Sequence, residues 1–213
     1  MLLQLSELEL CLGSQPVAVQ PQARPALAVA AHDVGRAVNR PDAEGQIEGA
    51  VLMGLGAADV VMPVVPMFHA NAWSIAFSAP IGGAALVMPG PKLDGASIHE
   101  LIETEQVTFS AAVPTVWQML LGYVEANGFK LNHLRRTIIG GSACPPSMMD
   151  AFRERHGVEV LHAWGMTEMS PVGTVGTLKN KQIALPKEEQ TAVRLKQGRA
   201  VPGVDMKIVD DAG

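Results

Sequence analysis

The sequence predicts an α/β fold in which helices flank a mostly parallel sheet. From about Ala58, short apolar runs alternate with stretches of helical periodicity, which is the pattern of β-α-β crossovers. The hydrophobic class makes up 48% of the 213 residues, enough to build a packed core. Aromatic residues are only 4%, so aliphatic side chains and methionine must fill most of that core.

The first elements each carry a local signal. Strands are expected at 60–66 and 83–89, and Pro63 favours an edge or end position because proline cannot donate to a sheet. A helix follows, with Asp94 as its N-cap. The apolar face of this helix has the spacing i, i+3, i+4 and consists of Ile98, Leu101 and Ile102.

The later elements continue the alternation. Pro114 ends one strand before a helix, Pro145 and Pro146 suit the first turn of another helix, and glycine follows both helices, as is typical of helix ends. In chain order we expect a strand at 107–113, a helix from 115 to near 128, a strand at 137–141, a helix at 145–156, and strands at 158–164 and 204–210. The charged stretch 179–196 is expected to form a solvated loop and helix face.

Composition excludes several classes of protein. A net charge of −5 and a pI near 5.7 argue against a nucleic-acid binder with a basic face. Two cysteines, Cys11 and Cys144, cannot form a disulfide framework or a cysteine-rich zinc module. No apolar run approaches the roughly 18 residues of a membrane span, and the N-terminal stretch lacks the basic region of a signal peptide. We therefore expect a soluble, cytoplasmic protein.

The chain divides into three regions of different composition. Residues 1–25 contain three prolines in their second half and are expected to be extended or flexible. Residues 26–57 are rich in alanine, glycine and valine, and the α/β pattern occupies 58–213.

Two loops fall at carboxyl ends of predicted strands, where ligands bind in open parallel sheets. One loop is 140–143. In the other, Trp164 offers a flat face to a heteroaromatic base, Thr167 a hydroxyl to a phosphate, and Glu168 a carboxylate to Mg²⁺. The alternative is a surface turn in which the threonine caps the next element.

The segment 162–168, HAWGMTE, resembles the Y-G-x-T-E motif of the adenylate-forming superfamily. Further segments resemble motifs of that superfamily in the same order: 67–73 (MFHANAW), 112–115 (AVPT), 139–143 (IGGSA) and 198–210. Within the superfamily, these motifs most resemble those of fatty acyl-CoA synthetases and methylthioalkanoate-CoA ligases. The resemblance implies part of the N-terminal domain of an adenylate-forming enzyme, with a mostly parallel sheet and flanking helices.

The resemblance also implies a reaction and a set of site residues. A small carboxylic acid, ATP and CoA would give acyl-CoA, AMP and pyrophosphate through an acyl-AMP. Thr167 would contact phosphate, Glu168 would hold Mg²⁺, and His69 would line the path to the acyl group or, alternatively, be a packed histidine. The nucleotide would lie against residues of both loops: Gly140, Gly141, Ser142, Ala143, Trp164, Gly165, Met166 and Thr167.

The sequence also departs from the superfamily. Nothing between Met1 and Val65 matches its Ser/Thr/Gly-rich phosphate loop, which ends in P-K-G and cradles phosphates through backbone N–H groups. The T-G-D aspartate, the hinge and the C-terminal domain follow later in the superfamily than the motifs present here. We therefore expect these 213 residues to be inactive alone. The alternatives are a nucleotide- or acyl-binding module without turnover and a non-functional chimeric product.

A second resemblance concerns 26–57. The stretches 32–39 (HDVGRAVN), 44–50 (EGQIEGA) and 53–56 (MGLG) resemble the molybdenum-binding subunit of xanthine dehydrogenases and aldehyde oxidases. This predicts a chimeric reading frame joined near Ala57 and Ala58. Separately, Cys144 precedes a predicted helix, and we expect it to be a small packed residue; the alternative is a thiol whose pKa the helix N-terminus lowers.

Overall fold

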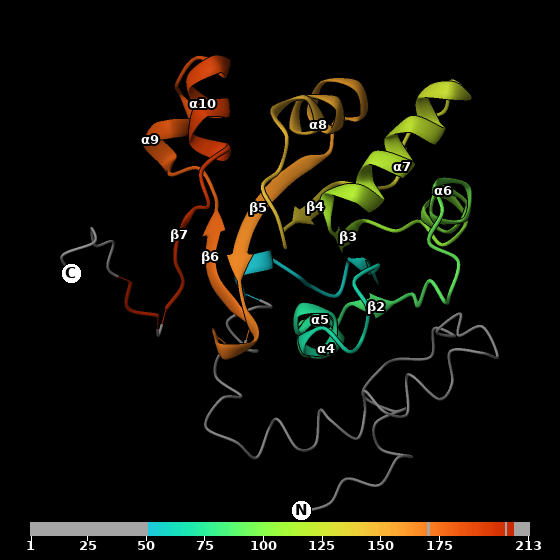
Figure 1. Cartoon of the computed structure of the whole chain (residues 1–213), viewed down its shortest axis with the longest axis horizontal. Helices are drawn as coiled ribbons and strands as arrows, with labels where there is room; N and C mark the ends of the chain where they lie inside the picture. The colour runs from blue at the N-terminus through green and yellow to red at the C-terminus, as the bar shows by residue number, and fades with distance from the viewer. Residues whose placement is uncertain (1–50, 170, 203, 207–213) are drawn as a thin grey trace, which may run out of the picture.

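The computed structural model describes residues 51–169, 171–202 and 204–206, and in this part of the chain it contains one seven-stranded sheet (Figure 1). The strand order is β2-β1-β3-β4-β5-β6-β7. The first five strands in this order are parallel, and β6 and β7 are added antiparallel. The strands are β1 (Val60–Pro63), β2 (Ala85–Leu86), β3 (Phe109–Ala112), β4 (Arg136–Ile139), β5 (Glu159–Gly165), β6 (Val172–Gly176) and β7 (Arg199–Ala200).

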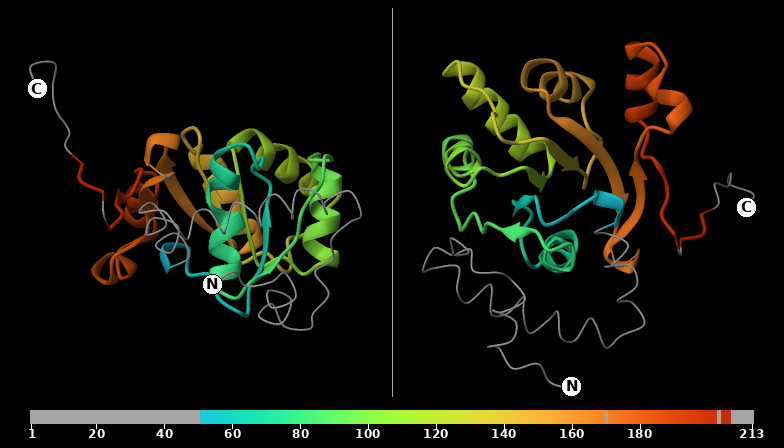
Figure 2. Two further views of the ribbon diagram at one scale, coloured as in Figure 1. Left: turned by 90° about the horizontal axis from the view of Figure 1, so that it is seen from below. Right: turned by 180° about the vertical axis from the view of Figure 1, so that it is seen from behind.

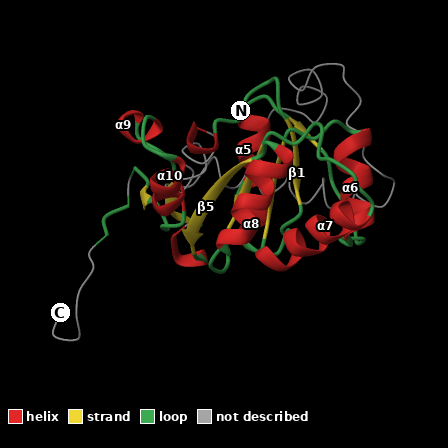
Figure 3. Cartoon of the chain, turned by 90° about the horizontal axis from the view of Figure 1, so that it is seen from above, coloured by secondary structure: helices red, strands yellow, loops and turns green. Residues whose placement is uncertain are grey.

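The helices cover both faces of the sheet. In Figure 1, α6, α7 and α8 lie above the sheet and α4 and α5 lie below it, and the rear view in Figure 2 agrees. Figure 3 places α9 and α10 beside β5, away from α6 and α7. The helices are α4 (Ala70–Trp73), α5 (Ile75–Ile81), α6 (Gly95–Thr104), α7 (Pro114–Ala126), α8 (Pro146–Asp150), the π-helix η1 (Ala151–Arg155), the 3-10 helix η2 (Thr167–Met169), α9 (Asn180–Ile183) and α10 (Lys187–Arg194).

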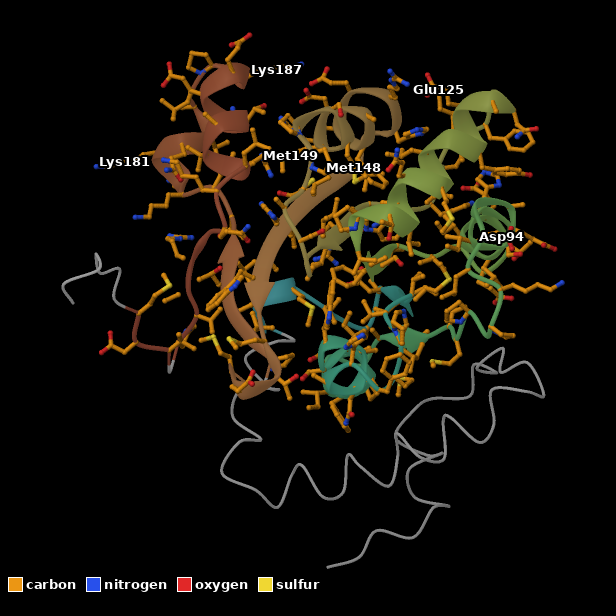
Figure 4. The ribbon with its side chains drawn as sticks, in the orientation of Figure 1. Asp94, Glu125, Met148, Met149, Lys181 and Lys187 are labelled. Atoms are coloured by element: carbon orange, nitrogen blue, oxygen red, sulfur yellow. The ribbon has the colours of Figure 1, made fainter. Side chains whose placement is uncertain are left out.

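Each face of the sheet has its own core. Above the sheet, Ile98, Trp117 and Phe152 are fully buried among the side chains of α6, α7 and η1. Met148 and Met149 of α8 belong to the same core and lie on the side of α8 that faces the sheet (Figure 4). Below the sheet, a second core joins residues of α4 and α5 to the lower face of β1, β3 and β4.

Residues 51–57 pack onto the lower core, although the chimera hypothesis places a junction at their end. Met53 and Leu55 are buried there. Nη1 of Arg136 donates to the carbonyls of Met53 and Gly54 at 2.8 and 2.9 Å. Nη2 of the same side chain donates to both carboxylate oxygens of Asp59 at 2.8 Å. Residues 1–50, which include the expected lead and most of 26–57, lie outside the described residues.

The predicted α/β fold is confirmed. Pro63 ends β1, Asp94 caps α6 by accepting from the Ser97 N–H at 3.0 Å, and Gly128 follows α7 with a positive φ. The charged stretch 179–196 forms the solvated helices α9 and α10, from which Lys181 and Lys187 project outward (Figure 4).

Other expectations need correction. The expected strand at 204–210 is described only at 204–206, and these residues form no strand. The sequence analysis missed β6 and β7, because their apolar runs are too short and glycine-rich to show alternation. It also missed α4 and α5, and it did not foresee that the helix starting at Pro146 continues as a π-helix.

Candidate functional site

A cavity of about 350 Å³ opens at the carboxyl ends of β3, β4 and β5. The segment that follows β1 closes one side of it. Most of its lining is apolar, from Val65, Ile75, Val113, Ile138, Val172 and Val175. Residues of both predicted loops also line it, together with His69, Trp73 and residues of the 51–57 segment. The cavity therefore combines an apolar interior with a rim of glycine backbone, aromatic rings and a hydroxyl group.

The glycine-rich turn begins where β4 leaves the sheet. Ile139 pairs with His162 of β5, so Gly140 and Gly141 emerge directly beside the end of β5. Gly141 has a φ of +78°, a backbone conformation that favours glycine. A methyl group at position 140 would lie 3.1 Å from the Ala163 carbonyl oxygen and 3.3 Å from Cη2 of Trp73. Glycine therefore allows the backbone, β5 and an indole ring to meet at this point.

The segment after β1 reaches the glycine turn through an unusual backbone. Residues 70–74 all have positive φ, between 42° and 62°, and so form a left-handed turn. Hydrogen bonds hold it, from the Trp73 N–H to the His69 carbonyl at 3.1 Å and from the Ser74 N–H to the Ala70 carbonyl at 2.9 Å. This turn places the edge of the Trp73 ring against Gly140 and Gly141.

The end of β5 carries the second loop. The register with β6 shifts between Trp164 and Gly165, and this irregularity redirects the chain into η2. The Trp164 side chain is 40% exposed at the cavity, and one edge of its ring packs closely on Gly173 of β6. A side chain at position 173 would occupy space that the indole ring fills, so Gly173 allows this ring position.

The structure brings most of the predicted site residues to one cavity. Its lining includes seven of them: His69, Gly140, Gly141, Trp164, Gly165, Met166 and Thr167. Ser142, Ala143 and Glu168 are exposed beside it without lining it. Cys144 is buried, and burial raises the pKa of its thiol to about 11. The expectation that Cys144 is a small packed residue is therefore confirmed, and the alternative of a thiol with a lowered pKa is wrong.

Sequence analysis assigned no role to two residues that shape this cavity. Trp73 belongs to a recognisable motif, but its position over the glycine turn depends on a left-handed backbone that alanine, asparagine and tryptophan do not signal. Gly173 lies in a strand that was not predicted. The close approach of Trp164 would have been the only signal for it, and that contact exists only in the folded chain.

Two further features of the described residues bear on the chemistry. Among residues 51–169, 171–202 and 204–206, no three His, Cys, Asp or Glu side chains are grouped as a protein-only metal site requires. Over the same residues, no helix combines the length and apolar character needed to cross a membrane.

Comparison with known proteins identifies relatives of the chain. The family model described as AMP-binding enzyme matches residues 41–213, so the match begins inside the segment 26–57. The 3-methylmercaptopropionyl-CoA ligase of Ruegeria lacuscaerulensis is 52% identical over 162 residues, and the medium-chain-fatty-acid–CoA ligase of Ectopseudomonas oleovorans is 50% identical over 161 residues. Each alignment covers 76% of this chain and 30% of the relative. The chain thus spans about a third of the length of these relatives.

The fold is also found in solved structures. The O-succinylbenzoate coenzyme A synthetase of Bacillus subtilis, solved in complex with ATP and magnesium ion, superposes with a TM-score of 0.64 at 21% identity. The superposition covers 81% of this chain and 33% of that protein. At this identity the likeness establishes the shared fold.

Proposed function

Because the chain belongs to the AMP-binding enzyme family, we propose that it is part of an ATP-dependent acyl-CoA synthetase. In the proposed reaction, a carboxylate oxygen attacks the α-phosphorus of ATP and pyrophosphate leaves. The thiolate of CoA then attacks the acyl carbonyl, and AMP leaves with the electron pair of the broken C–O bond. The observation that carries the proposal is that the glycine turn and the Trp164–Thr167 loop line one cavity.

The residues present fit a nucleotide. The indole of Trp164 offers a partly exposed π-face on which a purine can stack, and Gly140 and Gly141 let the nucleotide approach the backbone. The hydroxyl of Thr167 can donate to a phosphate oxygen. Since charge accumulates on phosphoryl oxygens during this reaction, such fixed donors contribute electrostatic stabilisation as well as position.

Mg²⁺ also fits, with the nucleotide supplying most of its ligands. Mg²⁺ in nucleotide sites is usually held by one or two carboxylates together with phosphate oxygens and water. Glu168 directly follows the lining residue Thr167 and is exposed, so its carboxylate could serve as the protein ligand. When bound, the ion would neutralise phosphate charge.

The acyl substrate is proposed to have a short or medium apolar chain. The apolar lining residues, among them Val65, Ile75 and Val113, suit such a chain. The names of the two ligase relatives, for 3-methylmercaptopropionate and medium-chain fatty acids, support the same class. His69, at the rim, is proposed to lie between nucleotide and acyl group, and the acidic, cysteine-poor composition supports a cytoplasmic location.

Two variants of the 213-residue chain test the nucleotide site by calorimetric titration with AMP and with MgATP. Trp164→Ala should weaken AMP binding about tenfold, because base–aromatic stacking contributes roughly 1–3 kcal/mol. Phe129→Ala is the matched control, since Phe129 is 44% exposed and does not line the cavity. Glu168→Gln should weaken MgATP binding while leaving metal-free AMP binding unchanged.

ATP–pyrophosphate exchange with hexanoate or octanoate tests turnover. Binding of AMP without exchange would agree with our expectation that these residues are inactive alone. If millimolar AMP does not bind wild type, or if Trp164→Ala binds AMP as tightly as wild type does, the proposed site is wrong.

We further propose that the part of segment 26–57 before residue 41 derives from a different protein, because the AMP-binding match already includes residues 41–57. The motif-like stretch 32–39 supports this origin. Sequencing the genomic locus across the codons of residues 32–58 tests it, and one uninterrupted reading frame in independent isolates would support a natural fusion.

A further inference from the structure

His162 is a buried titratable residue that the proposed reaction does not use. It lies on β5 two residues before Trp164, is 2% exposed, and does not line the cavity. Its ring connects two other segments. Nε2 accepts a hydrogen bond from the Cys144 N–H at 3.3 Å, and Nδ1 lies 3.2 Å from the Leu195 carbonyl oxygen.

These two contacts require one protonation state. A backbone N–H can only donate, so Nε2 must carry a free lone pair. A backbone carbonyl can only accept, so Nδ1 must carry the proton. The neutral Nδ1–H tautomer satisfies both partners, whereas the protonated ring would place an N–H against the Cys144 N–H. Each hydrogen bond thus determines the tautomer that the other one needs.

The segments that His162 connects support two parts of the candidate nucleotide site, the glycine turn and strand β6. Cys144 ends the turn that begins at Gly140 and Gly141. Leu195 is the C-cap of α10, and two residues later the Gln197 carbonyl accepts a hydrogen bond from Thr174 of β6. Thr174 is adjacent to the glycine on which Trp164 packs. The imidazole lies on the face of β5 opposite Ala163, which lines the cavity, and it contacts the supports of the glycine turn and of β6.

We propose that His162 is a positioning residue that holds the 140–144 turn in register with the end of α10, so that the glycine turn and Trp164 face each other across the nucleotide site. The inference rests on the proposed function for the nucleotide, but the contact that it invokes is present in the chain without ligand.

The surroundings of the ring favour its neutral form. Burial lowers the pKa of His162, and the backbone carbonyls of Leu195, Ser142 and Lys196, which favour the protonated ring, oppose this only in part. The Cys144 thiol is neutral because its own pKa is raised. On α10, Arg194 is paired with Glu159 at 3.2 Å and Lys196 is exposed, while the neighbours on β4 and β6 are Ile139 and Gly176.

The sign of the pH effect follows from the lowered pKa. A ring whose pKa is below 6.5 in the folded chain binds its proton less tightly there than when it is released. Acid below pH 6.5 therefore favours a state in which the ring leaves Cys144 and the turn is freed. AMP affinity should fall as the pH is lowered through this range.

Two variants and one measurement on wild type test the inference. His162→Gln keeps a donor and an acceptor without a titrating group, whereas His162→Phe keeps the ring shape without either. In His162→Phe we expect faster amide hydrogen exchange at Cys144 and AMP affinity about tenfold weaker, as loss of a buried hydrogen bond predicts. His162→Gln should keep the affinity of wild type at pH 7.5 and lose its decline below pH 6.5.

The outcomes separate this inference from the proposed function. Unchanged Cys144 exchange in His162→Phe, or an Nε2–H tautomer in the ¹H–¹⁵N spectrum of the wild-type imidazole, overturns the positioning role without reference to nucleotide. The tautomer measurement needs no variant, so it decides the matter even if His162→Phe does not fold. Failure of wild type to bind AMP overturns the proposed function, and the exchange result then decides whether His162 holds the turn.

Discussion

Gly173→Ala should disturb the nucleotide site although Gly173 itself is not proposed to contact the ligand, because the added methyl would displace Trp164. The added methyl carbon would lie 2.5 Å from Cζ3 and 2.7 Å from Cε3 of Trp164, and 2.8 Å from the sulfur of Met169. Ordinary carbon–carbon contacts are about 3.5–4.0 Å, so the indole must retreat by about 1 Å. The methionine is flexible and can give way, but the indole is rigid and must turn as a unit.

The size of the expected loss in stability depends on where the displaced Trp164 ring can move. Overpacking a closed core costs about 1–3 kcal/mol, and because Trp164 is 40% exposed the ring can move towards solvent, which favours the lower end. We therefore expect unfolding to become easier by about 1 kcal/mol. A ring displaced by about 1 Å no longer stacks squarely on a purine, and loss of about 1.4 kcal/mol of stacking corresponds to a tenfold weaker affinity.

The assay compares calorimetric AMP affinity with urea unfolding for wild type, Gly173→Ala and two reference variants. Gly122→Ala is the matched control, because position 122 is on the exposed face of α7 and has no atom within 4 Å of the added methyl. It should leave AMP affinity unchanged and stabilise the helix by up to about 1 kcal/mol. Adding Trp164→Phe to Gly173→Ala should restore part of the lost affinity, because the smaller ring leaves room for the methyl group.

The reasoning is refuted if Gly173→Ala binds AMP as tightly as wild type does. It is equally refuted if the double variant binds no better than Gly173→Ala alone, because the affinity would then depend on something other than the fit between the methyl group and the indole. A loss of stability larger than about 3 kcal/mol would show that the ring cannot retreat to solvent, against its observed exposure.

Two further predictions concern stability and can be measured by urea denaturation. Ala70→Gly should stabilise the chain by about 0.5–1 kcal/mol, because alanine at φ 42° is strained and glycine is not, and this gain exceeds the entropy that glycine adds to the unfolded state. As the control, Ala192→Gly in the right-handed helix α10 should destabilise the chain by about 1 kcal/mol. Arg136→Met should destabilise it by about 3 kcal/mol, since it leaves Asp59 largely buried without its cation and frees two carbonyls of the 51–57 segment, and a loss below 1 kcal/mol would contradict that account.

The parallel half of the fold was predictable because its signals are local. Each of the first five strands is a short apolar run bounded by a turn residue. The helices α6 and α7 carry an apolar face that a period of 3.6 residues reveals, and Asp94 caps α6. The residues that are buried in the structure are those that this apolar pattern predicts. The antiparallel end was not predictable in this way, because β6 contains two glycines in five residues and owes its place to pairing with β5.

The candidate site was likewise predictable only in part. The loops at 140–143 and 164–168 could be located from the sequence, because parallel strands bring their carboxyl ends to one edge of the sheet whatever their side chains are. The contacts that hold these loops in place could not be predicted, because they involve residues distant in sequence. Trp73 reaches the glycine turn only through five left-handed residues, and His162 meets Leu195, 33 positions later, only once α10 has folded onto β5.

The left-handed turn links these observations to function. Five consecutive non-glycine residues in this conformation are each disfavoured by roughly 1–2 kcal/mol, so surrounding contacts must compensate for the strain. Ala72 and Ile75 supply them in the lower core, and the ring of Trp73 supplies them at Gly140 and Gly141. Since Trp73 also lines the cavity, a ligand that displaced its ring would remove part of that compensation. The left-handed conformation of the 70–74 segment is thus coupled to the position of the Trp73 ring in the cavity wall.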